Sequence, residues 1–158
     1  MKAGGLDALD QAIMRALVND ARLTSLELAR QVPLSPTAIA RRITILEESD
    51  VIAGYEAKIN HETLGLKIKA IVRVGLNAQS DSLLKAFEEA VSAISSVVSC
   101  HLVSGEDDYI LGVLAQDLSD YERVHNEKLS RLPGVVRLNS SFALRTIADR
   151  PSLNFLRY

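Results

Sequence analysis

The 158-residue chain contains one cysteine, Cys100, and three histidines, His61, His101 and His125. One cysteine excludes an internal disulfide and fits a reducing compartment. The histidines lie far apart in the sequence with no second cysteine to join them, so a metal site is not expected. The chain also has no run of 18 apolar residues and no recognisable signal peptide. These absences predict a soluble cytoplasmic protein that needs no metal or other cofactor and no membrane partner.

The chain also lacks the excess of basic residues that is common in nucleic-acid-binding proteins. It has 18 Lys and Arg against 20 Asp and Glu, and residues 1–60 are themselves close to neutral. DNA binding requires only a local basic face. Between Glu27 and Glu47 the only charged residues are Arg30, Arg41 and Arg42. A locally positive segment therefore keeps DNA binding open.

Two consecutive helix-start signals lie within residues 24–47. Thr24 and Glu27 have the spacing of a capping box. Ser35 is a good N-cap, and Pro36 follows at the first helical position, where proline is favoured. A short helix, a tight turn over 31–34 and a second helix have the pattern of a helix-turn-helix. The second helix of that motif enters the DNA major groove.

The second helix has a core side and an outer side. At about 100° per residue, one stripe contains Ile39, Ile43 and Leu46, and the opposite side contains Thr37, Arg41 and Thr44. Arg41 could contact a guanine edge or a phosphate, and the threonines a phosphate or a thymine methyl. Arg42, near the core edge, could reach a phosphate or pair with a carboxylate. The alternative is an ordinary solvated helix face. The candidate DNA-binding residues are Ser35, Pro36, Thr37, Arg41, Arg42 and Thr44.

The periodicity of the chain changes after residue 66. Before it, we expect a first helix over 7–18, a left-handed residue at Asp50 that ends the third helix, and an extended pair around Gly54 that would form a wing. After it, alternation predicts strands over 67–77, 97–103, 109–115 and 135–147. Helices are expected over 81–94 and 119–132, the second capped by Ser119. The predicted fold is α+β: a winged helix-turn-helix over 1–60, a linker over 61–66, and a ferredoxin-like βαββαβ domain over 67–158.

Two helices cover only one face of a ferredoxin-like sheet. The residues expected on the uncovered face are apolar, namely Ile71, Val97 or Val98, Ile110 or Leu111, and Leu138. An exposed apolar sheet face of several hundred Å² is uncommon in a monomer. We therefore expect a partner subunit to cover it.

Several sequence blocks resemble those of a known family. They are LDALDQAIMRALVNDARLT, LELA, LSPTAIARRI, LEESDVIAGY, CHLVSGEDDYILGV, LSRLPGV and SSFAL. With these blocks in order from about Leu6 to Ile147, the chain resembles the Lrp/AsnC, or feast/famine, family of bacterial and archaeal transcription regulators. The resemblance implies a DNA-binding winged helix-turn-helix and a second domain that forms homodimers, which often assemble into octamers. It also implies a small effector, usually an amino acid, bound between dimers near residues 105–109.

The resemblance also implies which residues bind the effector. They are Leu102, Gly105, Glu106, Asp108, Tyr109 and Ser141, with Leu118 and Phe142 at neighbouring positions. An Asp108 carboxylate could meet an ammonium group, and backbone N–H groups a carboxylate. Taken alone, the same loop could be a polar sheet turn that binds nothing. The chain departs from the family at Pro33, where glycine is usual, and at Thr44 and Ile45, where basic residues are frequent, so the operator sequence stays open.

An effector-responsive DNA-binding regulator has three alternatives: an enzyme, a protein-interaction module and an architectural DNA-binding protein. An enzyme is not expected, because the sequence offers no catalytic residues: no nucleophile–base pair, metal cluster or phosphate-binding loop. A protein-interaction module remains an alternative, since the first helix is acidic and the N-terminal domain nearly neutral. An effector-independent, architectural DNA-binding protein is a further alternative.

Overall fold

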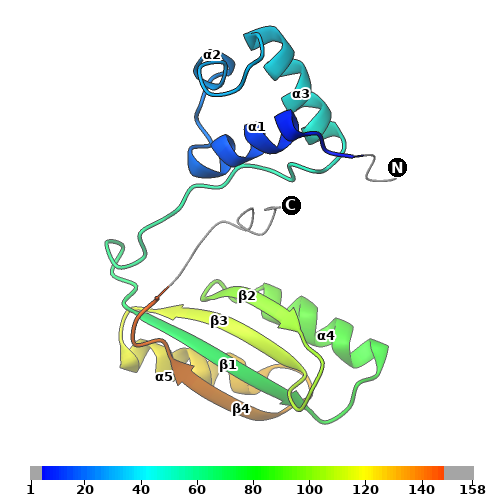
Figure 1. The fold of residues 1–158 in the computed structure, drawn as a ribbon. Helices are drawn as coiled ribbons and strands as arrows, with labels where there is room; N and C mark the ends of the chain where they lie inside the picture. Colours follow the sequence, from blue (N-terminus) through cyan, green and yellow to red (C-terminus); the bar gives the residue numbers. More distant parts are fainter. Residues whose placement is uncertain (1–4, 148–158) are drawn as a thin grey trace. The chain divides into compact units, whose positions relative to one another are not determined.

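The computed structural model describes residues 5–147, which form two compact units that divide between Lys58 and Ile59 (Figure 1). The first unit contains α1 (Ala8–Asn19), α2 (Ser25–Leu28) and α3 (Pro36–Glu48). The second contains β1 (Ile68–Leu76), α4 (Asp81–Ser92), β2 (Val97–Leu102), β3 (Tyr109–Ala115), α5 (Leu118–Glu127), the 3-10 turn η1 (Leu129–Arg131) and β4 (Val135–Phe142). Within residues 5–147, no helix is long and apolar enough to cross a membrane. The same residues contain no group of three His, Cys, Asp or Glu side chains placed to hold a metal ion.

The three helices of the first unit enclose a small core of their own. Its buried members come from all three helices and the turn that follows α2: Ile13, Leu17, Leu28, Val32 and Ile39. They recur at helical spacing, so each helix presents one apolar stripe inward. The predicted three-helix unit is therefore confirmed, with α1 displaced by one residue from the predicted range.

The predicted wing is not present. Asp50 adopts the expected left-handed conformation, with φ of 58°, and the backbone N–H groups of Val51 and Ile52 bond to the carbonyl of Leu46. No strand is found between α3 and β1. A tight hairpin needs a turn such as Asn-Gly or Asp-Gly, which Ala53-Gly54 does not supply. The segment instead borders a hollow beside α1.

The second unit has the predicted ferredoxin-like topology. Its four strands are ordered β2-β3-β1-β4, and every neighbouring pair is antiparallel. Both α4 and α5 pack on one face of this sheet, because Phe87 of α4 and Val124 of α5 share a core with Val72 and Leu111 of the central strands. The alternation of β1 predicted this face correctly, since Ala70, Val72 and Val74 are all buried.

Among the boundaries that differ from those predicted, the start of α5 and the end of β4 have clear local causes. The cap of α5 is Asp117, whose carboxylate accepts the backbone N–H of Asp120 at 2.8 Å, so the predicted Ser119 cap is wrong. Aspartate is as favourable an N-cap as serine, and Asp117 lies two residues after the end of β3. Strand β4 stops at Phe142 instead of continuing to Ile147, because its partner there is Ala70 and β1 begins only two residues earlier.

The uncovered face is less apolar than predicted. Ile71 and Val98 lie on it and are 44% and 55% exposed. Leu138, however, pairs with Val74 and packs into the core, so its predicted place on the open face is wrong. By the same alternation, β4 contributes Arg137, Asn139 and Ser141 to the open face. The face is therefore an apolar centre beside a polar strand.

Candidate DNA interface and effector loop

The helix-turn-helix is fixed by two caps. Glu27 accepts the Thr24 backbone N–H at 2.8 Å, and the Thr24 hydroxyl accepts the Glu27 N–H at 3.3 Å. The Thr24 N–H and then the Thr24 hydroxyl, which donates to the same carboxylate at 2.7 Å, hold the pKa of Glu27 below its ordinary value. The Ser35 hydroxyl accepts the Ala38 N–H at 3.2 Å, and Pro36 occupies the first turn of α3. The predicted capping box and N-cap are both confirmed.

Pro33 is accommodated by a very tight turn. The Leu34 N–H donates to the Val32 carbonyl at 2.7 Å, which closes a three-residue turn with Pro33 at its centre. An inverse γ-turn requires φ near −75° at the central residue, close to the value at which proline is fixed. The turn therefore takes a proline where the family usually has glycine, and Val32 remains buried in the core.

The outer side of α3 carries five of the six predicted DNA-binding residues. Ser35, Pro36, Thr37, Arg41 and Thr44 are all exposed. Ile39 and Leu46 are buried on the opposite side. Ile45, 51% exposed, adds an apolar surface where the family often has a basic residue. The Thr44 hydroxyl donates to the Ala40 carbonyl at 3.1 Å, and its oxygen can still accept a hydrogen bond from another group.

Arg42 differs from the other five residues. Its Nη1 donates to Asp7 Oδ2 at 2.8 Å and to Asp10 Oδ1 at 2.7 Å. The sequence left either a DNA phosphate or a carboxylate as the partner of Arg42, and in the structure Arg42 pairs with two carboxylates. The pair of carboxylates raises the pKa of the guanidinium, and the pKa of Asp7 is lowered, first by the Asp10 backbone N–H and then by Arg42. The carboxylates at the start of α1 thus neutralise the charge of Arg42, and Arg41 keeps the exposed positive charge of α3.

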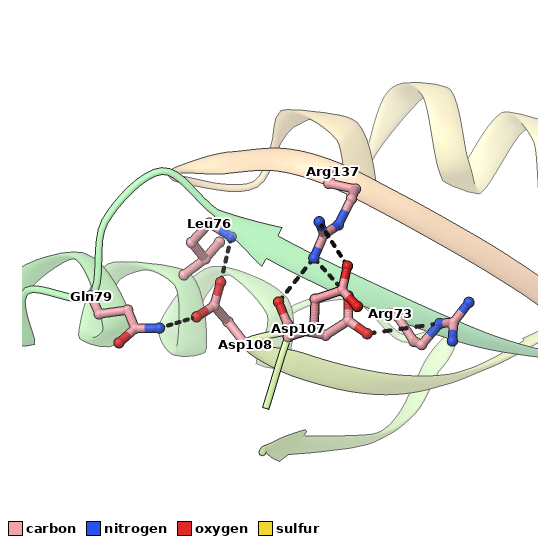
Figure 2. Close-up of polar contacts among 7 residues, drawn as sticks. Arg73, Leu76, Gln79, Asp107, Asp108 and Arg137 are labelled. Atoms are coloured by element: carbon pink, nitrogen blue, oxygen red, sulfur yellow. Dashed lines mark hydrogen bonds and ion pairs between the residues drawn. The ribbon is translucent and has the colours of Figure 1, made fainter. Parts of the chain in front are cut away.

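The 103–108 loop joins β2 to β3 and is held at its base by Asp108. This residue is 8% exposed, and its carboxylate accepts the Leu76 N–H at 2.6 Å and the Gln79 side-chain amide at 2.5 Å (Figure 2). Its own N–H donates to the Val74 carbonyl at 2.8 Å. Both carboxylate oxygens are therefore engaged within the chain, and Asp108 does not present a free charge to a ligand.

A second set of contacts holds Asp107 against the sheet. Arg137 Nη2 lies 3.0 Å from Asp107 Oδ1, and Arg73 Nε lies 3.8 Å from Oδ2 (Figure 2). Arg137 also donates to the Glu106 carbonyl at 2.9 Å. Arg137 lies on β4 and Arg73 on β1, so two neighbouring strands each contribute one ion pair to Asp107. The sequence pattern did not single out Asp107, Arg73 or Arg137, because the contacts depend on strand register.

Tyr109 belongs to the core of the second unit. It is 1% exposed, its ring centroid lies 4.4 Å from that of Phe87, and its hydroxyl donates to Glu88 Oε1 at 2.8 Å. Burial, followed by the Glu88 carboxylate, raises the pKa of its phenol. Tyr109 was expected to contact the effector; in this chain its side chain lies in the core beneath the loop.

The remaining candidates divide between two parts of the sheet. Gly105, Glu106 and Leu102 are exposed at the loop or beside it. Gly105 has φ of 131°, a conformation that favours glycine. Ser141 pairs with Ile71 in β1, away from the Val74–Leu76 end to which the loop bonds. One chain therefore does not bring Ser141 to the loop.

Comparison with known proteins accounts for both units. Residues 6–47 match the AsnC-type helix-turn-helix domain, and residues 69–153 match the Lrp/AsnC ligand binding domain. The chain is 38% identical over 145 residues to the Bkd operon transcriptional regulator of Pseudomonas aeruginosa, covering 92% of this chain and 95% of that protein.

Two solved structures have the same fold. The crystal structure of a transcriptional regulator from Neisseria meningitidis in complex with L-methionine is 31% identical, with a TM-score of 0.90 over 96% of this chain and 99% of the other. A feast or famine regulatory protein from M. tuberculosis, complexed with L-methionine, is also 31% identical, with a TM-score of 0.82 over 92% of this chain and 96% of the other. The chain therefore belongs to the Lrp/AsnC family of transcription regulators, with an AsnC-type helix-turn-helix domain followed by a Lrp/AsnC ligand binding domain.

Proposed function

We propose that the chain binds specific double-stranded DNA through the outer side of α3 and that an amino acid bound at the 103–108 loop changes this activity. The observation that supports the DNA contact is the orientation of α3. Its buried stripe fixes the helix on the core and leaves Thr37, Arg41 and Thr44 facing solvent. Arg41 is suited to a guanine edge, and the threonines to phosphates or thymine methyls.

For the effector, we propose contacts with the exposed part of the loop. The Glu106 carboxylate lies 3.6 Å from Arg137, but its side chain is 89% exposed. The carboxylate can therefore also accept a hydrogen bond from the ammonium group of a ligand. Gly105 lets the ligand approach the backbone, and Leu102, 60% exposed, offers an apolar contact for a side chain. Asp108 and Tyr109 serve this site by fixing the loop. The two relatives complexed with L-methionine support an amino acid as the class of ligand.

A second copy of the chain is part of this proposal. Ile71, Val98 and Ile110 give the uncovered sheet face an apolar centre, and a homodimer would remove it from water. A two-fold dimer would carry two α3 helices, which suits a partly palindromic operator. Assembly of dimers into octamers, as the family resemblance implies, would bring Ser141 of one copy and the loop of another into one assembly.

A screen of the twenty amino acids by thermal unfolding tests the effector. An amino acid at a hundred times its dissociation constant should stabilise the protein by about 2.7 kcal/mol. If none shifts the unfolding temperature and salt-dependent duplex binding persists, the protein is an effector-independent regulator. If duplex binding itself is absent at low salt, α3 is not a DNA-binding helix and the protein-interaction alternative replaces it.

A further inference from the structure

The contacts of Arg42 form a closed arrangement with the first turn of α1. Asp7 Oδ1 accepts the Asp10 N–H at 2.8 Å, and Asp10 Oδ2 accepts the Asp7 N–H at 3.2 Å, which is the capping box of this helix. The two oxygens that the box leaves over, Asp7 Oδ2 and Asp10 Oδ1, both accept from Arg42 Nη1. Each of the four carboxylate oxygens therefore has a donor.

We infer that Arg42 is a positioning residue, which with Asp7 and Asp10 sets the orientation of α3 on α1 and thereby the DNA sequence preference of its outer side. The inference rests on the proposed DNA contact by α3. It assigns no DNA contact to Arg42 itself, although this residue lies next to Arg41 in the helix.

Burial and distance in sequence support a positioning role. The side chains of Arg42 and Asp10 are 29% and 17% exposed, so the pair is shielded from solvent more than a typical surface ion pair. Asp10 precedes Arg42 by 32 residues, so the contact joins two separate helices. The cap also holds both carboxylates in place before Arg42 arrives, which lowers the entropy cost of forming the pair.

Charge argues against a phosphate contact by Arg42. One guanidinium shared between two carboxylates leaves the group of three with a net charge of −1, which repels DNA phosphates. Contact with a phosphate would require Arg42 to leave both carboxylates. No carboxylate among residues 5–147 pairs with the exposed Arg41. Although they are adjacent in sequence, Arg41 is thus expected to contact DNA and Arg42 to position α3.

A small change in the orientation of α3 is expected to affect specific binding most. Hydrogen bonds to base edges require close geometry, whereas attraction to phosphates tolerates small movements. Loss of the Arg42 contacts should therefore lower the affinity for the preferred sequence and leave the affinity for other sequences nearly unchanged. A lost phosphate contact would instead weaken binding to all sequences and reduce the salt dependence.

The test uses the full chain and two duplexes: one selected from a random pool by the wild-type protein, and one of the same composition with the sequence shuffled. The variants are Arg42→Ala, the double variant Asp7→Asn/Asp10→Asn, and all three changes combined. Asparagine keeps both oxygens that the cap needs, so α1 should remain capped. Arg22→Ala and Asp20→Asn alter an exposed pair outside α3. The first removes one positive charge, as Arg42→Ala does, and the second measures the effect of removing one negative charge.

We expect Arg42→Ala and the double variant each to lower the ratio of specific to non-specific affinity by roughly tenfold, and Arg42→Ala to keep the salt slope of the wild type. The combined variant should lose no more than either, because all three changes break one unit. The two controls should leave the ratio unchanged. Circular dichroism establishes that each variant is folded. If Arg42→Ala does not fold, the capped double variant tests the inference alone.

Three results would overturn the inference. A salt slope reduced by about one unit in Arg42→Ala would make Arg42 a phosphate contact. Additive losses in the combined variant would show that the arginine and the aspartates act separately. An unchanged ratio in a folded variant would remove the positioning role. Arg41→Ala, measured in parallel, separates these results from a failure of the proposed interface, which is indicated if that variant also binds like the wild type.

Discussion

The carboxylate of Asp108 accepts the backbone N–H of Leu76 at 2.6 Å and thereby joins the 103–108 loop to the end of β1. The same carboxylate accepts the side-chain amide of Gln79, which lies just before α4. Loop, strand and helix start thus share one buried acidic residue. A ligand that moves this loop should also act on Gln79 and on the segment that leads into α4, because this contact is direct.

Replacing Asp108 should affect stability and ligand binding together. Asp108→Ala leaves the Leu76 N–H and the Gln79 amide without their acceptor, which should cost about 1–3 kcal/mol of unfolding free energy. Calorimetric titration should then show loss of amino acid binding, while duplex binding by the first unit persists. Asp108→Asn is the matched control, since its amide oxygen can still accept one bond. Equal ligand affinity in the wild type and Asp108→Ala would place the pocket elsewhere.

Glu106 should act on the ligand without acting on the fold. Its side chain is 89% exposed, so Glu106→Gln should leave the unfolding temperature unchanged. If the carboxylate meets the ammonium group of an amino acid, its loss should weaken binding by about 1.5–3 kcal/mol, the range for a hydrogen bond to a charged group. Calorimetry with the amino acid found by thermal screening measures this. A full-affinity Glu106→Gln protein would show that the ammonium group binds another acceptor.

Arg41 is expected to contribute directly to DNA recognition. Arg41→Ala should weaken binding to the preferred duplex by about 1–3 kcal/mol and leave the fold intact, because the side chain lies outside the core. Gel-shift titrations of Arg41→Ala and Arg22→Ala separate a specific contact from general electrostatics. Arg22→Ala removes the same charge from an exposed site outside α3. Equal losses in the two variants would mean that Arg41 contributes only charge.

The uncovered sheet face should determine assembly. Ile71→Glu places a carboxylate at the apolar centre of this face and should convert the dimer to monomers, because a buried unpaired charge is costly. Light scattering at micromolar concentration measures the mass. Leu64→Glu is the control, as Leu64 is 65% exposed and precedes the sheet in sequence. A wild-type protein that is itself monomeric under these conditions would contradict the proposed dimer.

The capped carboxylates should make stability depend on pH in the acid range. Asp7 and Glu27 have pKa values below their ordinary values of 3.8 and 4.5, chiefly because the backbone N–H groups of Asp10 and Thr24 donate to them. The unfolded chain therefore binds these protons first, so the stabilisation is complete above about pH 5 and is lost as pH falls further. Thermal unfolding followed from about pH 6 to about pH 3 should show this decline.

Variants test the assignment of this pH dependence. Asp7→Asn and Glu27→Gln keep an oxygen for each cap but remove the titrating group, so the decline should be shallower in each. Asp20→Asn, on the exposed turn between α1 and α2, serves as the control. A decline as steep as that of the wild type in both cap variants would assign the acid sensitivity to other carboxylates.

Local signals in the sequence determined where several elements begin. Thr24, Glu27, Ser35 and Pro36 act on backbone groups within three residues, so the starts of α2 and α3 were predicted correctly. The alternation of β1 likewise predicted its buried face, because side-chain direction in a strand depends only on position along it. The family resemblance also followed from the sequence, through blocks whose order does not depend on the fold being known.

Tertiary structure decided which partners the polar residues take. Arg42 had two possible partners until α1 was packed beside α3, and Asp108 became a buried anchor only once β1 and β3 were paired. Leu138 was assigned to the wrong face because alternation along β4 does not say which of its two sides meets the helices, and its pairing with the buried Val74 decides this. The bonds of Arg42 and Asp108 join residues more than thirty positions apart. The sequence therefore determined the local elements and the family, and long-range packing determined which charged groups remain free to bind.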